Sequence, residues 1–341
     1  MKHKSRAIFG ASLIAATCLF AAGGANAAAT IVNTAGTVAL GVNDLGHLNT
    51  TVGSVAVNTP LTGATGLAYR FPTGEFRDGT APGCLCEGWG VSVDGFASGF
   101  ANVVSGTGGL TLGSFASTAT SATSVTSLTS LPGLTITHAY SEADNAPGAL
   151  FKSVVTIRNT TGSAVTNLRY VRVMDWDVPL TEFSEHVTIR GTATTTLLEK
   201  SHNDGFATAN PVPGDDIGIG AGTVDVDFTD VGPFDQGAYF RFNFGSLANG
   251  ANYVFTIFYG ATGSEATALA AIAAESIELF SFGQSTGPSG NPALGTPATF
   301  IFGFAGVGGT PVGRVPEPGS LALVALSLGL LGAGTLRRRR S

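Results

Sequence analysis

Apolar and polar residues alternate along most of residues 28 to 312, which is the pattern of β-strands with one buried face. Between Tyr239 and Phe244, three phenylalanines alternate with a tyrosine, an arginine and an asparagine. A turn rich in Gly and Asn follows, and Tyr253 to Tyr259 then form a second apolar stretch. We predict that these two strands form a hairpin.

The same pattern occurs earlier in the chain, at Phe151 to Asn159, a turn at residues 160–163, and Val165 to Val178. We predict a hairpin here as well. Its second strand carries apolar residues on both faces, so we expect it to be a central strand that is covered on both sides.

Gly, Pro and Asn separate further apolar or alternating segments, which predicts short strands joined by turns. Ser117–Ser130 is expected to be a solvated edge strand or a loop, and Ser281–Pro297 a loop. We predict an all-β fold, a large β-sandwich that spans residues 28–305. The additional strands are predicted at Ile31–Leu40, Gly88–Val93, Leu134–Tyr140, His186–Gly191, Thr223–Phe228 and Ala298–Phe304.

One segment departs from the alternation. Ser264 to Phe282 is rich in Ala, and Leu269, Ile272 and Phe280 have approximately helical spacing. Glu265 would lie near the N-terminus of such a helix, where a negative charge is favourable. We therefore predict a single short Ala-rich helix packed on the sandwich.

The composition narrows the class of protein. Of 341 residues, only 12% are charged and 44% are hydrophobic, which excludes a highly charged disordered chain and a coiled coil. Seven of the 17 basic residues lie in the two terminal segments. Residues 28–315 carry 10 basic and 22 acidic residues, a charge of −12, so no nucleic acid is expected as a partner. Cations and neutral sugars are more compatible with this charge.

The first 27 residues have the three parts of a secretory signal peptide. Residues 1–6 are basic, residues 7–22 are apolar and uncharged, and Ala25 and Ala27 form a small-residue cleavage site. We predict export by the general secretion machinery, with cleavage between Ala27 and Ala28.

A linker at residues 306–314 leads into a three-part tail at residues 315–341. The prolines of its first part restrict the backbone to an extended conformation, which a processing enzyme could bind. Residues 321–336 are uncharged and would form a transmembrane helix about 24 Å long, somewhat shorter than a hydrocarbon core of roughly 30 Å. Basic residues at the end hold that end in the cytoplasm. The first part is Val315, Pro316, Glu317, Pro318, Gly319 and Ser320, and the basic cluster is Arg337, Arg338, Arg339 and Arg340.

The order of a Pro-Glu-Pro motif, an apolar span and a basic cluster resembles the PEP-CTERM sorting signal of exported bacterial proteins. The resemblance covers residues 315–340 alone. It implies recognition by an exosortase, a membrane-embedded cysteine transpeptidase-like enzyme, and cleavage near Pro316 to Pro318. It also implies a Gram-negative host, an inner-membrane intermediate, and then a place at the cell surface or outside the cell, usually with extracellular polysaccharide or a biofilm. An ordinary single-pass anchor is the alternative.

Cys84 and Cys86 are the two cysteines that remain after signal cleavage. An oxidising compartment favours a disulfide between them, although a ring this small is strained. A redox-active or intermolecular link is a second interpretation. Half of a zinc site, which would need two further ligands, is a third.

Asp175 and Asp177 would lie on one face of an extended strand, roughly 6.5 Å apart. Glu182 and Glu185 follow after Pro179. Carboxylates in a loop after a strand supply the oxygen ligands that calcium prefers, so these four residues are a candidate calcium site.

A second acidic region lies between residues 215 and 230. Its aspartates at 225 and 227 alternate with apolar residues, which also fits a solvated sheet face. We therefore regard it as a weaker candidate for calcium. Its carboxylates are Asp215, Asp216, Asp225, Asp227 and Asp230.

No catalytic residues are predicted. Gly283 to Gly287 match G-x-S-x-G, but a nucleophile elbow needs a strand before it and a helix after it, whereas the predicted helix comes before. The histidines of the mature chain have no ligand spacing. They are His47, His138, His186 and His202.

Two features support further alternatives. Carboxylates beside Trp176 also fit a polysaccharide-active enzyme. Aromatic residues could form a surface that stacks on sugars, although core packing is their more frequent role. The candidates for stacking are Tyr69, Phe71, Trp89, Trp176 and Tyr239.

From these features we expect an exported, non-enzymatic surface or extracellular-matrix protein that an exosortase processes at its tail. A carbohydrate-binding module, with or without calcium, is the first alternative. A polysaccharide-active enzyme is the second.

Overall fold

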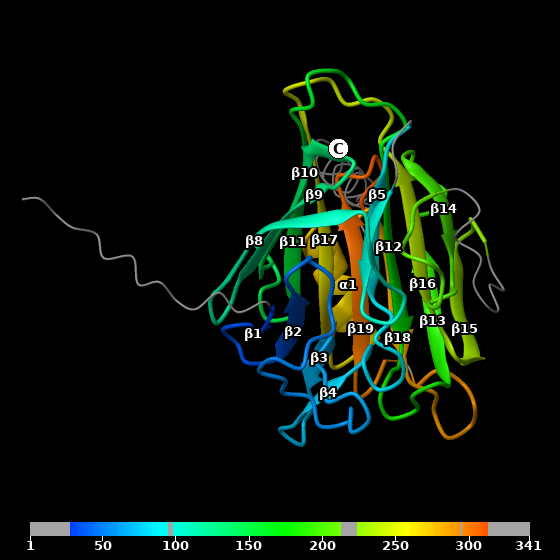
Figure 1. The fold of residues 1–341 in the computed structure, drawn as a ribbon. Helices are drawn as coiled ribbons and strands as arrows, with labels where there is room; N and C mark the ends of the chain where they lie inside the picture. The colour runs from blue at the N-terminus through cyan, green and yellow to red at the C-terminus, as the bar shows by residue number, and fades with distance from the viewer. Residues whose placement is uncertain (1–27, 95–97, 213–223, 294, 313–341) are drawn as a thin grey trace, which may run out of the picture.

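The computed structural model describes residues 28–94, 98–212, 224–293 and 295–312. The predicted signal peptide, the sorting tail, and Asp215 and Asp216 lie outside these residues. Within them, the chain forms three sheets and one short helix, and all pairings between the strands of these sheets are antiparallel (Figure 1). The expected all-β class with one short helix is therefore confirmed.

The largest sheet has nine strands and forms one layer of a sandwich-like fold. On several of its strands buried and partly exposed residues alternate, as the period of two predicted. Across this sheet the strands are β15 (Phe228–Phe234), β13 (Glu185–Arg190), β18 (Leu279–Gln284), β19 (Thr299–Ala305), β17 (Asn252–Thr262), β11 (Leu150–Asn159), β10 (Leu131–Glu142), β9 (Ala122–Leu128) and β8 (Leu110–Ser117).

A six-stranded sheet forms the opposite layer. Aromatic rings fill the space between the two layers: Phe240 contacts Phe302 with ring centroids 5.6 Å apart, and Tyr170 contacts Phe255 at 4.9 Å. Burial of these apolar surfaces is the main force that holds the layers together. The strands of this sheet are, in order, β14 (Leu198–His202), β16 (Gln236–Asn243), β12 (Arg169–Trp176), β5 (Gly88–Ser92), β6 (Gly99–Asn102) and β7 (Gly106–Gly108).

The N-terminal segment adds a four-stranded sheet, and helix α1 (Glu265–Ala274) covers part of the outer face of the nine-stranded sheet. Ile272 of the helix joins a buried cluster with Phe258 and Ile301 of that sheet. The N-terminal sheet consists of β1 (Ala28–Val32), β2 (Val38–Asn43), β3 (Leu67–Arg70) and β4 (Phe76–Asp78).

Strand β12 is central, as predicted, with β16 on one side and β5 on the other. Its inner residues, Met174 and Trp176 among them, belong to the core between the layers. Its outer residues Val171 and Val173 are buried under the segment that contains Ala207 and Ala209. Both faces of this strand are therefore covered.

The two predicted hairpins are wrong. β11 pairs with β10 and β17, whereas β12 belongs to the other sheet, and β16 and β17 are divided between the sheets in the same way. The two connections cross between the layers side by side, where Val165 and Leu247 exchange backbone hydrogen bonds of 3.0 Å. The two strands of each predicted hairpin therefore belong to different sheets. Their apolar faces pack against each other across the core, and the strands do not form neighbours within one sheet.

Three other predicted elements differ in their bounds. Ile31–Leu40 is two paired strands, because the side chain of Asn33 accepts hydrogen bonds from the N–H groups of Thr37 and Val38 and closes a turn. Thr223–Phe228 is not one strand, since β15 begins only at Phe228. Ser117–Ser130 contains the strand β9 as well as the end of the edge strand β8.

The predicted helix over Ser264–Phe282 is too long. Helix α1 ends at Ala274, Ser276 has a φ of 55°, and β18 follows between β13 and β19. β18 also takes up Ser281 to Gln284 of the predicted loop. Within the described ranges, no helix has the length and apolar character that crossing a bilayer requires.

Candidate metal centre

Asp175 and Asp177 lie at the end of β12, on the outer side of the six-stranded sheet. Trp176 between them points the other way, into the core, where its Nε1–H donates a hydrogen bond of 3.1 Å to Ser281 Oγ. Both aspartate side chains are buried, at 1% and 0% exposure. The alternation along the strand therefore places the two carboxylates together, as the sequence predicted.

A third carboxylate, that of Asp235, joins them. One carboxylate oxygen from each of Asp175, Asp177 and Asp235 lies within 4.8 Å of the others. Trp176 pairs with Gln236 at the start of β16, and this register brings the residue before Gln236 beside the end of β12. Asp235 is exposed, so the group of three carboxylates reaches solvent on its side.

Asp235 is not identifiable as a ligand from the sequence, because it lies 58 to 60 residues from its partners. Only the register between β12 and β16 brings these residues together. The segment before β16 does carry an Asp directly after an aromatic residue, but nothing local identifies its partner.

Two further carboxylates lie in the same region, and a third has a different partner. Glu185 Oε1 accepts a hydrogen bond of 2.9 Å from the N–H of Gln236, and Asp204 Oδ1 accepts one of 2.9 Å from the N–H of Phe206. Glu182 Oε1 instead accepts a hydrogen bond of 3.0 Å from the side-chain amide of Asn58. Of the four predicted ligands, the structure thus brings Asp175 and Asp177 together, with Glu185 close by.

Several of these buried oxygens have no hydrogen-bond partner. They are Oδ1 of Asp175, Oδ1 of Asp177, Oε2 of Glu185 and Oδ2 of Asp204. Leaving a buried carboxylate oxygen unpaired is costly, and such atoms call for an explanation. The ion pairs that the described residues form with one another involve other carboxylates.

The carboxyl groups have raised pKa values because burial disfavours their charged forms. Burial, followed by the charges of Asp177 and Asp235, raises the pKa of Asp175 well above its ordinary value. Burial raises the pKa of Asp177 to about 7, although a hydrogen bond from Gly83 opposes the shift. Burial likewise raises the pKa of Glu185 to about 9, against the hydrogen bond from Gln236. Burial therefore favours the protonated forms of these carboxyl groups.

Two glycines make room for the carboxylates, and a third makes room for the backbone of β12. A Cβ at Gly83 would lie 2.7 Å from Asp177 Oδ1, and one at Gly205 would lie 2.6 Å from Asp175 Oδ1. A Cβ at Gly237 would lie 2.0 Å from the backbone oxygen of Met174. Any larger residue at these positions would have to displace the carboxylates or β12 itself.

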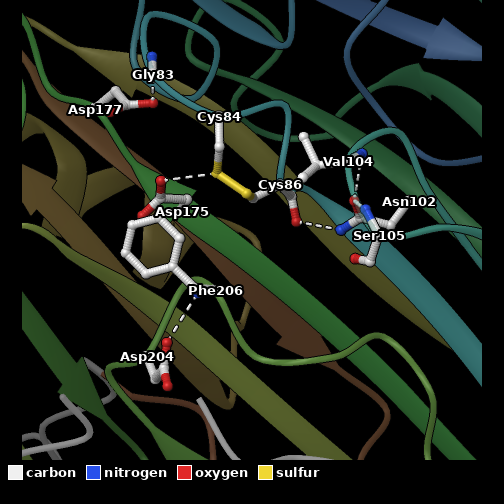
Figure 2. The surroundings of a disulfide bond; sticks show 10 residues. All are labelled: Gly83, Cys84, Cys86, Asn102, Val104, Ser105, Asp175, Asp177, Asp204 and Phe206. Atoms are coloured by element: carbon white, nitrogen blue, oxygen red, sulfur yellow. Dashed lines mark hydrogen bonds between the residues drawn. A yellow bond between two sulfur atoms is a disulfide. The ribbon is translucent and has the colours of Figure 1, made fainter. Parts of the chain in front are cut away.

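A disulfide joins Cys84 and Cys86 beside these carboxylates (Figure 2). Cys84 Sγ lies 3.1 Å from Asp175 Oδ2, and the N–H of Gly83 donates a hydrogen bond of 3.0 Å to Asp177 Oδ2. The sulfur and oxygen atoms of Cys84, Cys86 and Asp175 are also close enough to share an ion. Bonded to each other, however, the sulfurs are not the thiolates that zinc binds.

The second acidic region is engaged in local hydrogen bonds. Asp225 accepts a hydrogen bond of 2.7 Å from the N–H of Ser201, and Asp227 accepts bonds from the N–H and hydroxyl of Thr192. These carboxylates are exposed or bound to their neighbours, which fits the solvated-face interpretation.

Four of the five candidates for sugar stacking have the more frequent role of aromatic residues, which is core packing. Trp89, Trp176 and Tyr239 are 0% exposed and Phe71 is 5% exposed, so they pack in the core. Other aromatic residues are exposed next to the carboxylates. Phe183 and Phe206 are 51% and 39% exposed, and Phe234 precedes Asp235 with 40% exposure.

Phe183 has a backbone conformation that bulky residues rarely adopt. Its φ is 69°, in the left-handed region, where a side chain with a Cβ is strained. Its ring lies against Gly83, since a Cβ there would be 2.5 Å from the ring. Strain of this kind is often found at functional sites.

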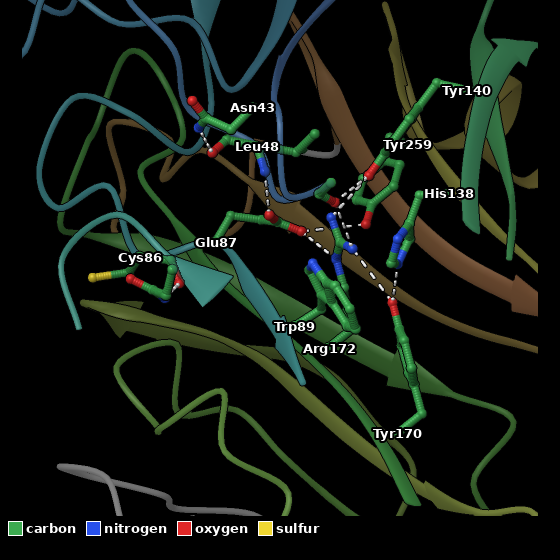
Figure 3. Close-up of polar contacts among 12 residues, drawn as sticks. Asn43, Leu48, Cys86, Glu87, Trp89, His138, Tyr140, Tyr170, Arg172 and Tyr259 are labelled. Carbon is green, nitrogen blue, oxygen red and sulfur yellow. Dashed lines mark hydrogen bonds and ion pairs between the residues drawn. The ribbon is translucent and has the colours of Figure 1, made fainter. Parts of the chain in front are cut away.

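A buried polar network occupies the centre of the sandwich (Figure 3). Arg172 forms an ion pair with Glu87, and it donates hydrogen bonds to the hydroxyl of Tyr140 at 3.2 Å and to the backbone oxygen of Gly46 at 3.2 Å. Tyr259 donates a hydrogen bond of 3.2 Å to Glu87. Burial acts to lower the pKa of Arg172, but the charge of Glu87 raises it well above its ordinary value.

The histidines form no metal cluster within the described part of the chain. His138 is buried in the central network, with Nε2 2.9 Å from the hydroxyl of Tyr170. His202 stacks on Tyr239 with ring centroids 4.4 Å apart. Their scattered positions in the sequence correspond to separate structural roles.

The G-x-S-x-G match does not form a nucleophile elbow. Gly283 lies within strand β18. Ser285 comes directly after this strand and is followed by a loop, in which Thr286 pairs with Pro292, instead of a helix. The sharp strand-to-helix turn that exposes a nucleophile is therefore not formed here.

Comparison with known proteins gives no further assignment. No protein-family model matches this chain, and no curated protein matches its sequence.

Proposed function

We propose that this chain is an exported, non-enzymatic surface or extracellular-matrix protein that an exosortase processes at its C-terminal tail. The observation that carries the proposal is the order Pro316-Glu317-Pro318, an apolar segment at 321–336 and four arginines. The N-terminal signal peptide supports it, because the domain must first cross the inner membrane. An association with extracellular polysaccharide or a biofilm belongs to the same proposal.

The burial of the acidic residues supports a non-enzymatic role. The structure does gather several carboxylates, as a hydrolase would require, but Asp175, Asp177 and Glu185 are buried. A glycosidase needs its two carboxyl groups on either side of a bound sugar. Two cavities among the described residues, of about 450 and 460 Å³, are lined by other residues.

The test is the intact mass of the protein recovered separately from the membrane, outer-surface and medium fractions of its native host. We expect a species that runs from Ala28 to the region of Pro316, outside the inner membrane. Replacing Pro316, Glu317 and Pro318 together by Ala should leave the tail attached. Pro311→Ala, in the linker, is the matched control and should be processed normally.

Two outcomes would overturn the proposal. One is a wild-type chain that keeps residues 321–340 in the inner membrane, which would make the tail a permanent anchor. The other is normal processing of the triple variant, which would mean that the Pro-Glu-Pro motif is not recognised.

A calcium-dependent carbohydrate-binding module is the second candidate function. The observation that favours it is the exposure of Phe183, Phe206 and Phe234 beside the acidic residues, because exposed aromatic rings stack on sugars. Retention of the protein on host polysaccharide, with and without a chelator, tests it. Phe183→Ala should weaken retention, whereas Leu112→Ala, an exposed apolar residue on β8, should not.

Equal retention of these two variants, or no retention of the wild type, would exclude this candidate. Release of reducing ends from the polysaccharide in the same experiment would instead favour the enzymatic alternative.

A further inference from the structure

The carboxylates of Asp175, Asp177 and Asp235 lie together, and none of the ion pairs found among the described residues includes them. One oxygen from each lies within 4.8 Å of the other two. Three oxygens spaced evenly around one calcium ion, at 2.3–2.6 Å each, are about 4.0–4.5 Å apart. The three carboxylates therefore need to approach one another by no more than a few tenths of an ångström to bind one ion.

A second, independent observation indicates a ligand. Asp175 is 1% exposed and Asp177 is 0% exposed, and Oδ1 of each has no hydrogen-bond partner. Their Oδ2 atoms are already in contact with Cys84 and Gly83. Each of the two buried carboxylates thus has one oxygen available to an ion, and burial makes its unpaired state costly.

The surroundings restrict the kind of ion. The donors are carboxylate oxygens, which hard cations prefer, and the adjacent sulfurs are bonded to each other. The exposed Asp235 leaves one side open to water, which supplies the remaining ligands that calcium needs. Magnesium requires a nearly ideal octahedron, to which buried carboxylates on rigid strands adapt poorly.

We propose that Asp175, Asp177 and Asp235 bind one calcium ion, which fastens the end of β12 to the connection between β15 and β16. β12 and its continuation position Asp175 and Asp177. The pairing of Trp176 with Gln236 positions Asp235, the residue before Gln236. Glu182 does not belong to this group of oxygens, and its Oε1 accepts a hydrogen bond from Asn58. The site deepens the second candidate function but is tested without any polysaccharide, so the two can fail separately.

The experiment uses the full chain, purified and treated with a chelator, and titrates it with calcium chloride alone in a calorimeter and in thermal unfolding. Extracellular modules bind calcium with Kd values of roughly 10⁻⁴–10⁻³ M, so the titration extends to about 10 mM. We expect one ion per chain. The midpoint temperature should rise by about 2 °C or more for each tenfold increase of calcium above Kd.

Asp175→Asn and Asp235→Asn should each abolish this calcium-dependent rise. Asn keeps the shape of the side chain without its charge, and Asp235 is exposed, so folding of the second variant is not at risk. The matched control is Asp225→Asn, which removes a carboxylate of the other acidic region and should keep the full response.

Three outcomes would overturn the proposal. They are the absence of heat and of a thermal shift with the wild type, a response to magnesium chloride but not to calcium chloride, and a response that persists in both Asp175→Asn and Asp235→Asn.

Discussion

Arg172 and Glu87 form an ion pair in which both side chains are fully buried, at the centre of the sandwich. The second oxygen of Glu87 accepts a hydrogen bond of 2.6 Å from the N–H of Leu48, and the guanidinium lies over the ring of Tyr259. The pair therefore links the loop after β2, both layers of the sandwich and the entry to β5.

Arg172→Met should destabilise the protein by about 3–5 kcal/mol, because it leaves the Glu87 carboxylate buried without its partner. The free energy of unfolding in chemical denaturant measures this. The matched control is Arg169→Met on the same strand, whose partially exposed ion pair with Glu199 should contribute no more than about 1 kcal/mol. Equal losses in the two variants would show that the buried pair has no special role.

The two buried histidines should each reduce the stability as the pH falls below about 6.5, whereas the raised pKa values of the buried carboxyl groups act in the opposite direction. Burial, assisted by the charge of Arg172, lowers the pKa of His47 to about 3, and burial lowers the pKa of His138 well below its ordinary value. Between pH 6.5 and 3 the unfolded chain thus takes up protons that the folded chain does not. Each such histidine costs about 1.4 kcal/mol per pH unit in this range, and the contribution is constant above it.

His47→Gln removes one of the two histidines that take up a proton on unfolding. Between about pH 6 and pH 4, the slope of its unfolding free energy against pH should be smaller by about 1.4 kcal/mol per pH unit than that of the wild type. An unchanged slope would mean that His47 is protonated in the folded protein.

Trp176→Ala should destabilise the protein by about 3–5 kcal/mol, since the ring is fully buried between the layers. Leu269→Ala is the control, because Leu269 is 42% exposed on helix α1 and its loss should change the stability by less than about 0.5 kcal/mol. Denaturant unfolding distinguishes the two. A stable Trp176→Ala variant that merely loses polysaccharide binding would contradict the buried position.

Ser264→Ala should destabilise helix α1 by about 1 kcal/mol. Ser264 is the N-cap residue, and its hydroxyl accepts a hydrogen bond from the N–H of Thr267. Ser289→Ala, in an exposed loop, should leave the unfolding midpoint unchanged. If both variants unfold at the same temperature as the wild type, the cap does not contribute.

Local patterns in the sequence predicted many of the strands. Alternation identified strands such as β10, β13 and β19 to within a few residues, because a period of two reports which side of a segment is apolar. It did not predict which strands pair. The apolar faces of β16 and β17 can be buried either when the two strands are neighbours in one sheet or when they lie in two facing sheets. Only the packing of the whole core decides between these arrangements.

For the candidate metal centre, too, the sequence predicted one part and the tertiary structure decided the rest. The sequence by itself determined that Asp175 and Asp177 share a face, since this follows from the geometry of one strand. The tertiary structure alone decided that Asp235 joins them, that Trp176 is buried and that Glu182 has another partner. These relationships depend on strand register and on the free energy of burying surfaces that are distant in the chain, and no local pattern contains that information.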